Sequence, residues 1–526
     1  MLPQLRPTFR LSSQSNTPPH RPEAKVKHTI IATALFIALS APAQATDAVV
    51  GQTAQFLSYN SVPEACVRIA PLPSANYDPD DLADEAALCA IDIYSPDIAL
   101  CPKIWSTSAA VVFYDISEGK FKDDRTGFQT TICAGGKIAK YVAKDQIARL
   151  KFSINQATTS ATFTPSSLLY YHFSRYFGFT TTVPVAVWRS IDKSVLLNEV
   201  ALGGQALSAD QDALAMNHAA WNTLVAAIAQ PESYEIPGSY GTAADFLTSD
   251  GRAAYGTVYD GGGTPYGPEM NGAVDDDTAE ARYASFLQSP VVLALSTDLP
   301  LADAIAAGLA HSATPITPVQ MAFWMREMAE IIMIDTLLSQ QDRPSNIDYR
   351  DYFYWQENGK IKRKRMRDQV PGQGDIPASA VILKRSRLND NDAAGRIEYD
   401  NHLLKLNAIA ALRHFDAELY ARLQALNTDF QAQGPIYMWL RDSLGLDESQ
   451  VAMIVANTAN VAQTLKTSMD QGRLRFDLDA EGFFIAATKE AQITRPTRRP
   501  NTENPTSFHA GSWAESGGHG PAFPQA

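Results

Sequence analysis

The sequence predicts an α+β fold with two lobes: a β-rich small lobe at residues 46–195 and a mainly helical large lobe at residues 196–488. Short apolar or alternating runs bounded by Gly, Asp and Ser dominate the chain up to about residue 190. Apolar residues at helical spacing dominate residues 318–338 and 401–470. The 526 residues allow about three domains or one large two-lobed unit, and an apolar content of 45% is enough for a sizeable core.

Residues 1–45 have the pattern of a secretory signal peptide. An apolar run at residues 29–40 follows two lysines and precedes the small-residue cleavage pattern Ala43-Gln44-Ala45. The run is shorter than the roughly 20 residues that span a bilayer, so an uncleaved anchor is the less favoured alternative. No later stretch is long and apolar enough for a membrane span, and we expect a periplasmic or secreted protein.

The formal net charge is −13, from 44 basic and 57 acidic residues. Removal of residues 1–45 takes away five basic residues and one acidic residue, which brings the charge of the mature chain to −17. This acidic balance argues against a general nucleic-acid binder, because phosphate contacts need clustered Lys and Arg. Residues 360–367 stand out, since six of these eight are Lys or Arg. One interpretation is an edge strand protected by charge; the other is a grip on phosphate or an acidic substrate.

The four cysteines, Cys66, Cys89, Cys101 and Cys133, all lie in the first third of the mature chain. In an exported protein an even number of cysteines predicts disulfides, each worth about 3 kcal/mol in the loop-entropy model. Three pairings are possible and the sequence does not decide among them; we favour Cys66–Cys89 with Cys101–Cys133. A zinc site is the alternative, although no Cys-x-x-Cys spacing is present.

Individual elements follow from local patterns. In the small lobe we expect strands at residues 109–114, 138–142, 147–154 and 182–188, and a helix over 168–177 that ends at Gly178. In the large lobe we expect helices at 213–229, 318–338 and within 401–470, a hairpin at 352–366 and a short strand at 381–384. Residues 489–526, rich in Pro, Gly, Ser and Thr, are expected to form a disordered tail.

Several common catalytic fingerprints are absent from the sequence. There is no G-x-S-x-G, H-E-x-x-H or G-x-x-x-x-G-K-[ST] pattern, and the run of glycines at residues 261–263 precedes no expected helix. The nine histidines show no metal-ligand spacing. These absences weaken the interpretations as a serine hydrolase, a zincin, a P-loop NTPase or a dinucleotide oxidoreductase.

Two acidic loops frame the predicted hairpin. The first (QDRPSN) follows the long helix and carries Asp342 and Asn346; the second (LNDND) follows a strand and carries Asp390 and Asp392. Taken alone, the first loop is more simply a capped loop with an Asp–Arg pair. The order helix, Asp loop, hairpin, Asp loop is that of kinase-like phosphotransferases. In these, one Asp orients or deprotonates the attacking hydroxyl, and an Asn and a second Asp hold Mg²⁺.

These motifs resemble the secretory-pathway kinases of the Golgi casein-kinase and four-jointed group. Residues 335–343 (DTLLSQQDR) are similar to the catalytic-loop segment of that group, in which an Asp seven residues upstream precedes an Asp-Arg pair. Residues 171–179 (YHFSRYFGF), followed by Val-Pro-Val, resemble its helix and the next strand. Residues 388–395 resemble its Asp-Asn-Gly metal loop. The matches span residues 145–400 in the family's order.

The resemblance implies a bilobal protein-kinase-like fold that uses ATP or another nucleoside triphosphate with Mg²⁺ or Mn²⁺. It implies that Asp342 is the catalytic base and that Asn346 assists at the catalytic and metal site. Asp390 is then expected to hold the metal, with Asp392 as the reserve candidate.

The nucleotide side of the site departs from the family. Lys151 resembles the lysine that contacts the phosphates, Lys144 is the alternative, and Arg343 is expected at the same cofactor site. The family pairs this lysine with a helix Glu, but the corresponding residue here is Ser167, and no acidic residue occurs between Lys151 and Ser190. Lys151 is therefore expected to lack its usual orienting carboxylate.

The expected function is the transfer of a phosphoryl group from a nucleoside triphosphate to a hydroxyl of a protein or glycan. Because of Ser167, the alternative from another class is an inactive pseudokinase-like protein that binds or regulates a partner. Transfer of the nucleotide moiety (AMP) is a third hypothesis. The expected partners are a nucleotide and a protein or glycan acceptor, without nucleic acid and without a membrane span.

Overall fold

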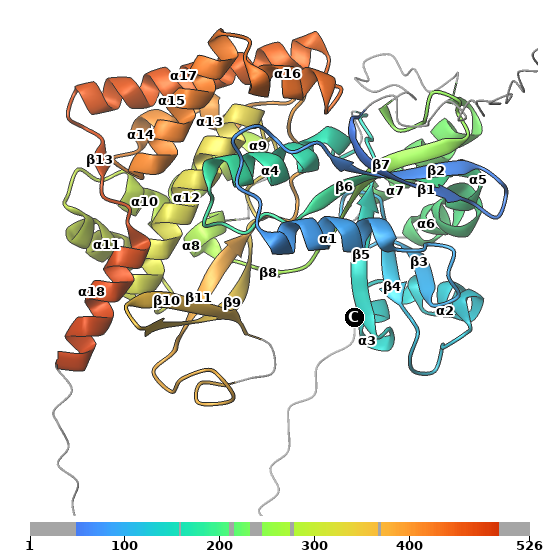
Figure 1. The fold of residues 1–526 in the computed structure, drawn as a ribbon, viewed down its shortest axis with the longest axis horizontal. Coiled ribbons are helices and arrows are strands. Elements are labelled where there is room, and N and C mark those ends of the chain that lie inside the picture. Colours follow the sequence, from blue (N-terminus) through green and yellow to red (C-terminus); the bar gives the residue numbers. More distant parts are fainter. Residues whose placement is uncertain are drawn as a thin grey trace, which may run out of the picture. The chain divides into compact units, whose positions relative to one another are not determined.

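The N-terminal part of the chain builds a seven-stranded sheet in which neighbouring strands are antiparallel (Figure 1). Its strands are β1 (Gly51–Leu57), β2 (Pro63–Ile69), β3 (Ile98–Pro102), β4 (Ala110–Asp115), β5 (Asp145–Lys151), β6 (Ala186–Asp192) and β7 (Ala253–Tyr259). Their order across the sheet is β1-β2-β6-β7-β5-β4-β3. The strand β5 therefore lies between β7 and β4, and it ends at Lys151.

The structure is a computed structural model, and it describes residues 49–156, 159–209, 215–231, 245–273, 278–366 and 370–493. All of these residues belong to one compact unit, Ala45–Ala526. Met1–Gln44 form a second unit, and the expected signal peptide lies outside the described residues. The tail expected at residues 489–526 lies outside them from residue 494 onward.

The other described elements are mainly helices, and most of these follow β7 in the chain. They are α1 (Pro79–Ala90), α2 (Arg125–Thr131), α3 (Ala139–Val142), α4 (Thr164–Phe177), α5 (Lys193–Val195), α6 (Leu202–Ser208), α7 (Ala215–Ala229), α8 (Pro268–Asn271), α9 (Ala279–Phe286), α10 (Pro290–Leu295), α11 (Leu301–Ala310), α12 (Pro318–Leu338), α13 (His402–Lys405), α14 (Ala408–Ala411), α15 (Ala417–Gln431), α16 (Pro435–Asp442), α17 (Glu448–Asp470) and α18 (Ala480–Ile493). A 3-10 segment (Cys133–Ile138), a π-helical segment (Leu196–Ala201) and a short parallel strand pair, β12 (His414–Phe415) with β13 (Arg475–Phe476), complete the set. The mixed α+β fold is thus confirmed.

A second, smaller sheet contains the predicted hairpin. Its strands are β8 (Thr264–Pro265), β9 (Asp348–Glu357), β10 (Lys360–Arg365) and β11 (Val381–Arg387). β9 pairs with β10, β11 and β8, all antiparallel. The turn residues Asn358 and Gly359 have φ angles of 52° and 75°, as a two-residue hairpin turn requires. The hairpin and the strand expected at residue 381 are therefore confirmed.

Two of the expected strands differ in the structure. Residues 138–142 are helical rather than extended: they end the 3-10 segment and form α3, in which Ala139 is buried while Ile138 and Tyr141, three residues apart, are 60% and 77% exposed. The strand expected from residue 182 joins the large sheet only at Ala186. Thr182 instead donates its N–H to Ser386 O at 2.9 Å and accepts from Leu388 N at 3.0 Å, which ties this segment to the end of β11.

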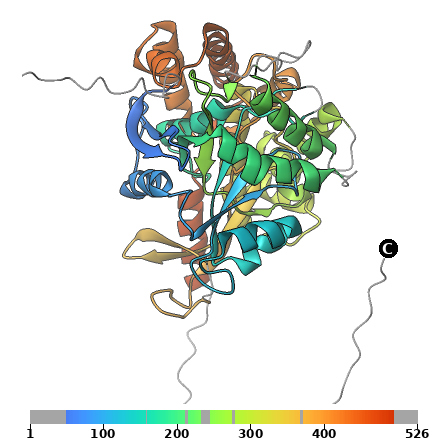
Figure 2. The ribbon, with the colours of Figure 1, turned by 90° about the vertical axis from the view of Figure 1, so that its right-hand side faces the viewer.

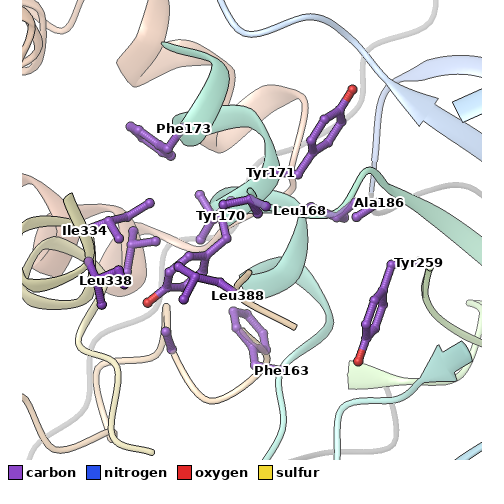
Figure 3. Close-up of a cluster of buried hydrophobic side chains, with 14 of the residues drawn as sticks. Phe163, Leu168, Tyr170, Tyr171, Phe173, Ala186, Tyr259, Ile334, Leu338 and Leu388 are labelled. Carbon is purple, nitrogen blue, oxygen red and sulfur yellow. The ribbon is translucent and has the colours of Figure 1, made fainter. Parts of the chain in front are cut away.

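The helix α4 joins the sheet to the long helix α12. Figure 3 shows its side chains, among them Leu168 and Tyr170, between Ala186 and Tyr259 of the sheet and Ile334 and Leu338 of α12. All of these residues are buried, so much of the driving force for this packing is removal of apolar surface from water.

The large sheet extends past residue 195, where the small lobe was expected to end. β7 lies beyond that residue and still pairs within the sheet.

Both disulfides have the favoured pairing. Cys66–Cys89 joins β2 to α1, and Cys101–Cys133 joins β3 to the 3-10 segment. Among the described residues there is no free cysteine, so the zinc alternative is wrong for these four.

The helices α6 and α7 lie side by side (green in Figure 2) and pack against the end of β3. Their contact is close at Gly204, where an added Cβ would lie 2.6 Å from the Trp221 ring. Trp221 Nε1 and Asn217 Nδ2 both donate to the carbonyl oxygen of Lys103, at 3.4 and 3.2 Å. The backbone that follows β3 is therefore held in place from α7.

Candidate functional site

The two acidic loops predicted from the sequence lie against each other. Gln341 N donates to Ala393 O at 3.0 Å, and Gly395 N donates to Leu338 O at 2.7 Å. The first loop begins where α12 ends, at Ser339 with a left-handed φ of 55°, and the second follows β11. Backbone hydrogen bonds thus bring Asp342 and Asp390 to one region.

A buried ion pair fixes the first loop to α12. Arg343 Nε lies 2.8 Å from Asp335 Oδ2, and Arg343 Nη2 lies 3.0 Å from Asp335 Oδ1. Tyr170 OH donates to the same carboxylate, and Arg343 Nη2 reaches Asn391 Oδ1 in the second loop at 3.0 Å. Burial alone would lower the pKa of Arg343, but the Asp335 carboxylate raises it above its usual value. Arg343, expected at the cofactor site, is instead buried behind it and joins the two loops.

Lys151 has the carboxylate partners that the sequence left in doubt. Its Nζ atom lies 2.8 Å from Asp390 Oδ1 and 2.9 Å from both Asp392 carboxylate oxygens, and the residue is 3% exposed. Burial alone would lower the pKa of Lys151, but the charges of Asp390 and Asp392 raise it well above its usual value. Burial would raise the pKa of Asp390, but Lys151 and then Lys103 hold it well below its usual range.

The start of α4 holds the loop that carries Asp392. Phe163 N donates to Asp392 O at 2.7 Å, and Ser166 Oγ donates to Asn391 O. Ser167, which stands where the family has its Glu, is buried in the same helix beside Asn389 and Asn391. The orienting carboxylate for Lys151 therefore comes from the second acidic loop and not from the helix.

A small cavity of about 60 Å³ lies between these groups. Of the predicted site residues, five line it: Lys151, Asp342, Asn346, Asp390 and Asp392. The other lining residues are Lys103, Ser106, Thr107, Ser108, Ser160, Ala161, Thr162 and Ala393. The volume suits a phosphate-sized group and is well below the roughly 300–1,000 Å³ of typical ligand pockets. The cavity is therefore large enough for one phosphate-sized group and too small for a whole nucleotide.

Lys103 is the charged residue of the cavity lining that the sequence did not predict. It is 4% exposed and follows β3 directly. Burial lowers the pKa of Lys103 to about 7, and the positive charge of Lys151 acts in the same direction. A signal for it was present: Lys103 is the one charged residue in the apolar run IALCPKI at residues 98–104.

Asp342 has the environment of a group that can exchange a proton near neutral pH. Burial raises the pKa of Asp342 to about 6, Arg282 opposes this, and Asp390 and Asp392 add to it. Arg282 Nη1 lies 4.0 Å from Asp342 Oδ1; nothing in the sequence pointed to Arg282. Asn346 Nδ2 donates to Asp342 O at 2.8 Å, which holds the loop in a tight turn and places Asn346 beside Asp342.

The cavity's donor set fits a hard divalent cation in part. Asp342, Asn346, Asp390 and Asp392 supply oxygen atoms, the ligand type that Mg²⁺ prefers. Within the described ranges, no three His, Cys, Asp or Glu side chains are grouped so that they alone could hold a metal ion. Mg²⁺ is usually held by one or two carboxylates together with substrate phosphates and water, and this lining can offer that smaller number.

Two other predicted cationic features lie away from the cavity. Lys144 pairs with Glu118 at 2.8 Å and with Asp115 at 3.7 Å, and it does not line the cavity. The basic run forms the edge strand β10, and Arg363 and Arg365 line a separate hollow of about 650 Å³. The two interpretations of this run therefore stay open. Its last member, Arg367, lies outside the described residues.

None of the helices in the described part of the chain combines the length and apolar character of a membrane span. Comparison of the sequence with protein-family models and with curated proteins finds no match.

Proposed function

We propose that the protein is an exported, kinase-like phosphotransferase that moves a phosphoryl group from a nucleoside triphosphate to a hydroxyl of a protein or glycan. One observation carries the proposal: Lys151, Asp342, Asn346, Asp390 and Asp392 come from three distant segments and line one cavity. A scattered arrangement would have left the motifs as ordinary capped loops. The antiparallel sheet that carries Lys151 and the helical part that carries Asp342 would be the two lobes of a bilobal kinase-like fold.

In this mechanism Asp342 is the general base. With a pKa of about 6, the Asp342 carboxylate is mostly ionised at neutral pH. This pKa is also close enough to neutral pH for the carboxylate to accept a proton during the reaction. The hydroxyl oxygen of the acceptor forms the new bond to phosphorus as the bond from phosphorus to the bridging oxygen of the nucleotide breaks. The hydroxyl proton passes to a carboxylate oxygen of Asp342, and the nucleoside diphosphate leaves with the electrons of the broken bond.

Asp390 and Asn346 are the residues that would hold Mg²⁺ or Mn²⁺, with Asp392 in reserve. When bound, the cation would neutralise the negative charge of the phosphates. Asp392 and Lys151 would keep Asp390 in place, since Lys151 Nζ contacts both carboxylates. Arg343 would act one layer further away, by joining Asp335 to Asn391.

Asp392 also bears on the choice between an active and an inactive protein. The inactive hypothesis rests on Ser167, because an unpaired Lys151 would be poorly oriented. Asp392, 2.9 Å from Lys151 Nζ, removes that reason and supports an enzyme. The small volume of the cavity supports the alternative, a pseudokinase-like protein that binds or regulates a partner, since the conformation described here leaves little room for a nucleotide.

The two disulfides support export, because disulfides persist in oxidising compartments such as the periplasm or the extracellular space. Kinship with the Golgi casein-kinase and four-jointed group is proposed on the same motifs and on their convergence.

A thermal-shift titration with ATP and Mn²⁺ tests the proposal. A ligand that binds the folded state raises the unfolding midpoint. We expect a rise that Asp390→Ala abolishes and that Asp470→Ala, which removes an exposed carboxylate paired with Lys466, leaves intact. The absence of any rise in the unsubstituted protein would favour the partner-binding alternative.

A further inference from the structure

The lysine expected to contact the phosphates is already held by two carboxylates. A lysine ammonium has three N–H donors, and the Nζ atom of Lys151 makes three contacts, one with Asp390 and two with Asp392. All three are between 2.8 and 2.9 Å, so they are charge-assisted bonds of normal length. A phosphate oxygen at Lys151 would have to compete with two carboxylates that already hold its ammonium group.

The second lysine of the cavity, Lys103, differs from Lys151 because no carboxylate in the described part of the chain holds its ammonium group. Lys103 Nζ makes no hydrogen bond or ion pair with any described residue, although Lys103 is 4% exposed and lines the same cavity. Its backbone is firmly held, because its N–H donates to Ala110 O at 2.9 Å and its carbonyl accepts from Asn217 and Trp221. A buried cation without a partner is costly, and an anion in the cavity would supply the partner.

Hydroxyl groups from the following loop lie beside it. Ser106, Thr107 and Ser108 all line the cavity. The Oγ atom of Ser106 is buried and has no hydrogen-bond partner. Buried polar atoms are nearly always paired, so Ser106 is a second group in this cavity that can still take a hydrogen-bond partner.

We propose that Lys103 and Ser106, and not Lys151, bind the phosphate oxygens of the nucleotide, while Lys151 serves to position Asp390 and Asp392. This inference rests on the proposed function and assigns the phosphate-contacting role within it. The ligand class is a phosphate-bearing anion that places one phosphate group in the cavity, because the cavity is phosphate-sized and its free donors are an ammonium and hydroxyls. Burial and then the charge of Lys151 lower the pKa of Lys103, which also faces Arg149, Asp390 and Asp392, so an anion bound there would favour the charged form of the lysine.

Calorimetric titration with two probes tests this assignment: inorganic tripolyphosphate and ATP, each with Mg²⁺. A hydrogen bond to a charged group is worth about 1.5–3 kcal/mol, so Lys103→Met should weaken both probes by roughly tenfold or more. Lys103→Arg should keep most of the affinity, and Lys144→Met, which changes an exposed lysine away from the cavity, should keep all of it. Ser106→Ala should weaken both probes by a smaller factor.

The outcomes separate this assignment from the proposed function. If Lys103→Met and Ser106→Ala bind both probes like the unsubstituted protein, the Lys103 assignment is wrong and the proposed function stands. If the unsubstituted protein binds tripolyphosphate through Lys103 but does not bind ATP, Lys103 is part of an anion site, but its assignment to a nucleotide and the proposed function are both wrong. If it binds neither probe, both are wrong.

A stability measurement shows whether Lys103 has only a structural role. Removal of a buried, unpaired cation should leave the ligand-free Lys103→Met protein as stable as the unsubstituted protein or more stable. Weaker binding together with unchanged or higher stability is the expected signature of a binding residue. Weaker binding that follows a lowered unfolding midpoint in Lys103→Met, with Ser106→Ala unaffected, would overturn the assignment.

Discussion

Lys151 Nζ lies 2.9 Å from both carboxylate oxygens of Asp392, although the two residues are 241 positions apart in the sequence. This contact joins the internal strand β5 to the loop after β11. It also supplies the carboxylate that α4 lacks at Ser167. The most informative relationship in the site is therefore one for which no local pattern in the sequence could give a signal.

Asp392→Ala should destabilise the protein by about 1–3 kcal/mol, because it removes one carboxylate from a buried lysine that retains only Asp390. Urea unfolding at pH 7 measures the effect. Asp400→Ala is the matched control: Asp400 pairs with Lys405 at 2.6 Å, but both side chains are mostly exposed, and exposed pairs contribute about 0–1 kcal/mol. Equal losses for the two variants would show that the Lys151–Asp392 pair is not a significant stabilising contact.

Asp335→Asn should lower the free energy of unfolding by about 3–5 kcal/mol, more than Asp392→Ala does. It leaves the fully buried Arg343 guanidinium without its countercharge. The readouts are the urea midpoint and, in addition, the affinity for ATP with Mg²⁺. We expect affinity to fall even under conditions where the variant remains folded, since Arg343 joins the two acidic loops through Asn391. Unchanged stability would contradict the positioning role assigned to Arg343.

Asp342→Asn should make the ligand-free protein more stable above pH 6 and have little effect near pH 4. The reason is the pKa of Asp342, about 6 in the folded protein against an ordinary 3.8. Between these values the folded state binds more protons than the unfolded state, so this group lowers stability as the pH rises through the window. Unfolding of both proteins at pH 4, 5, 6 and 7 checks this. A difference between them that does not grow with pH would show that Asp342 has an ordinary pKa.

The stability gained by Lys103→Met should fall as the pH rises, which is the opposite of the trend expected for Asp342→Asn. The pKa of Lys103 is about 7 in the folded protein and 10.5 when unperturbed, so the unfolded state binds more protons between these values. The lysine therefore destabilises the ligand-free protein most below pH 7, and the penalty declines as the pH rises toward 10.5. The stability gain from Lys103→Met should accordingly be larger at pH 6 than at pH 9. A gain that is the same at both values would mean that Lys103 titrates like an exposed lysine.

The parts of the fold that the sequence predicted correctly have local causes. The ends of α12 and the hairpin follow from a capping threonine, from Asn358-Gly359 with positive φ angles, and from periodic apolar residues. The strand expected at residues 138–142 is wrong because this short apolar run is not buried as a strand: Ile138 and Tyr141 are exposed, three residues apart in a helical turn. A short run of mostly apolar side chains can form either a short buried strand or an exposed helical turn, and the local sequence alone does not distinguish them.

The site was predictable only where residues share a motif. Asp342 with Asn346, and Asp390 with Asp392, are neighbours in sequence, and the structure brings both pairs to one cavity with Lys151. Lys103 and Arg282 reach the same region through strand pairing and helix packing, which connect residues far apart in the chain. Such contacts depend on the whole fold, so the lone lysine in the apolar run at residues 98–104 stood out in the sequence but gave no indication of its partners.

The central claim is phosphoryl transfer at the cavity between the two acidic loops. Its most direct test is incubation of the mature protein with ATP labelled in the γ-phosphate, Mg²⁺ or Mn²⁺, and protein and glycan acceptors, with the mass added to each acceptor read by mass spectrometry. We predict addition of a phosphoryl group that Asp342→Asn and Asp390→Ala each abolish and that Asp470→Ala does not change. Addition of AMP instead would assign nucleotide transfer. Labelling that persists in both site variants, or no transfer by the unsubstituted protein, would contradict the account.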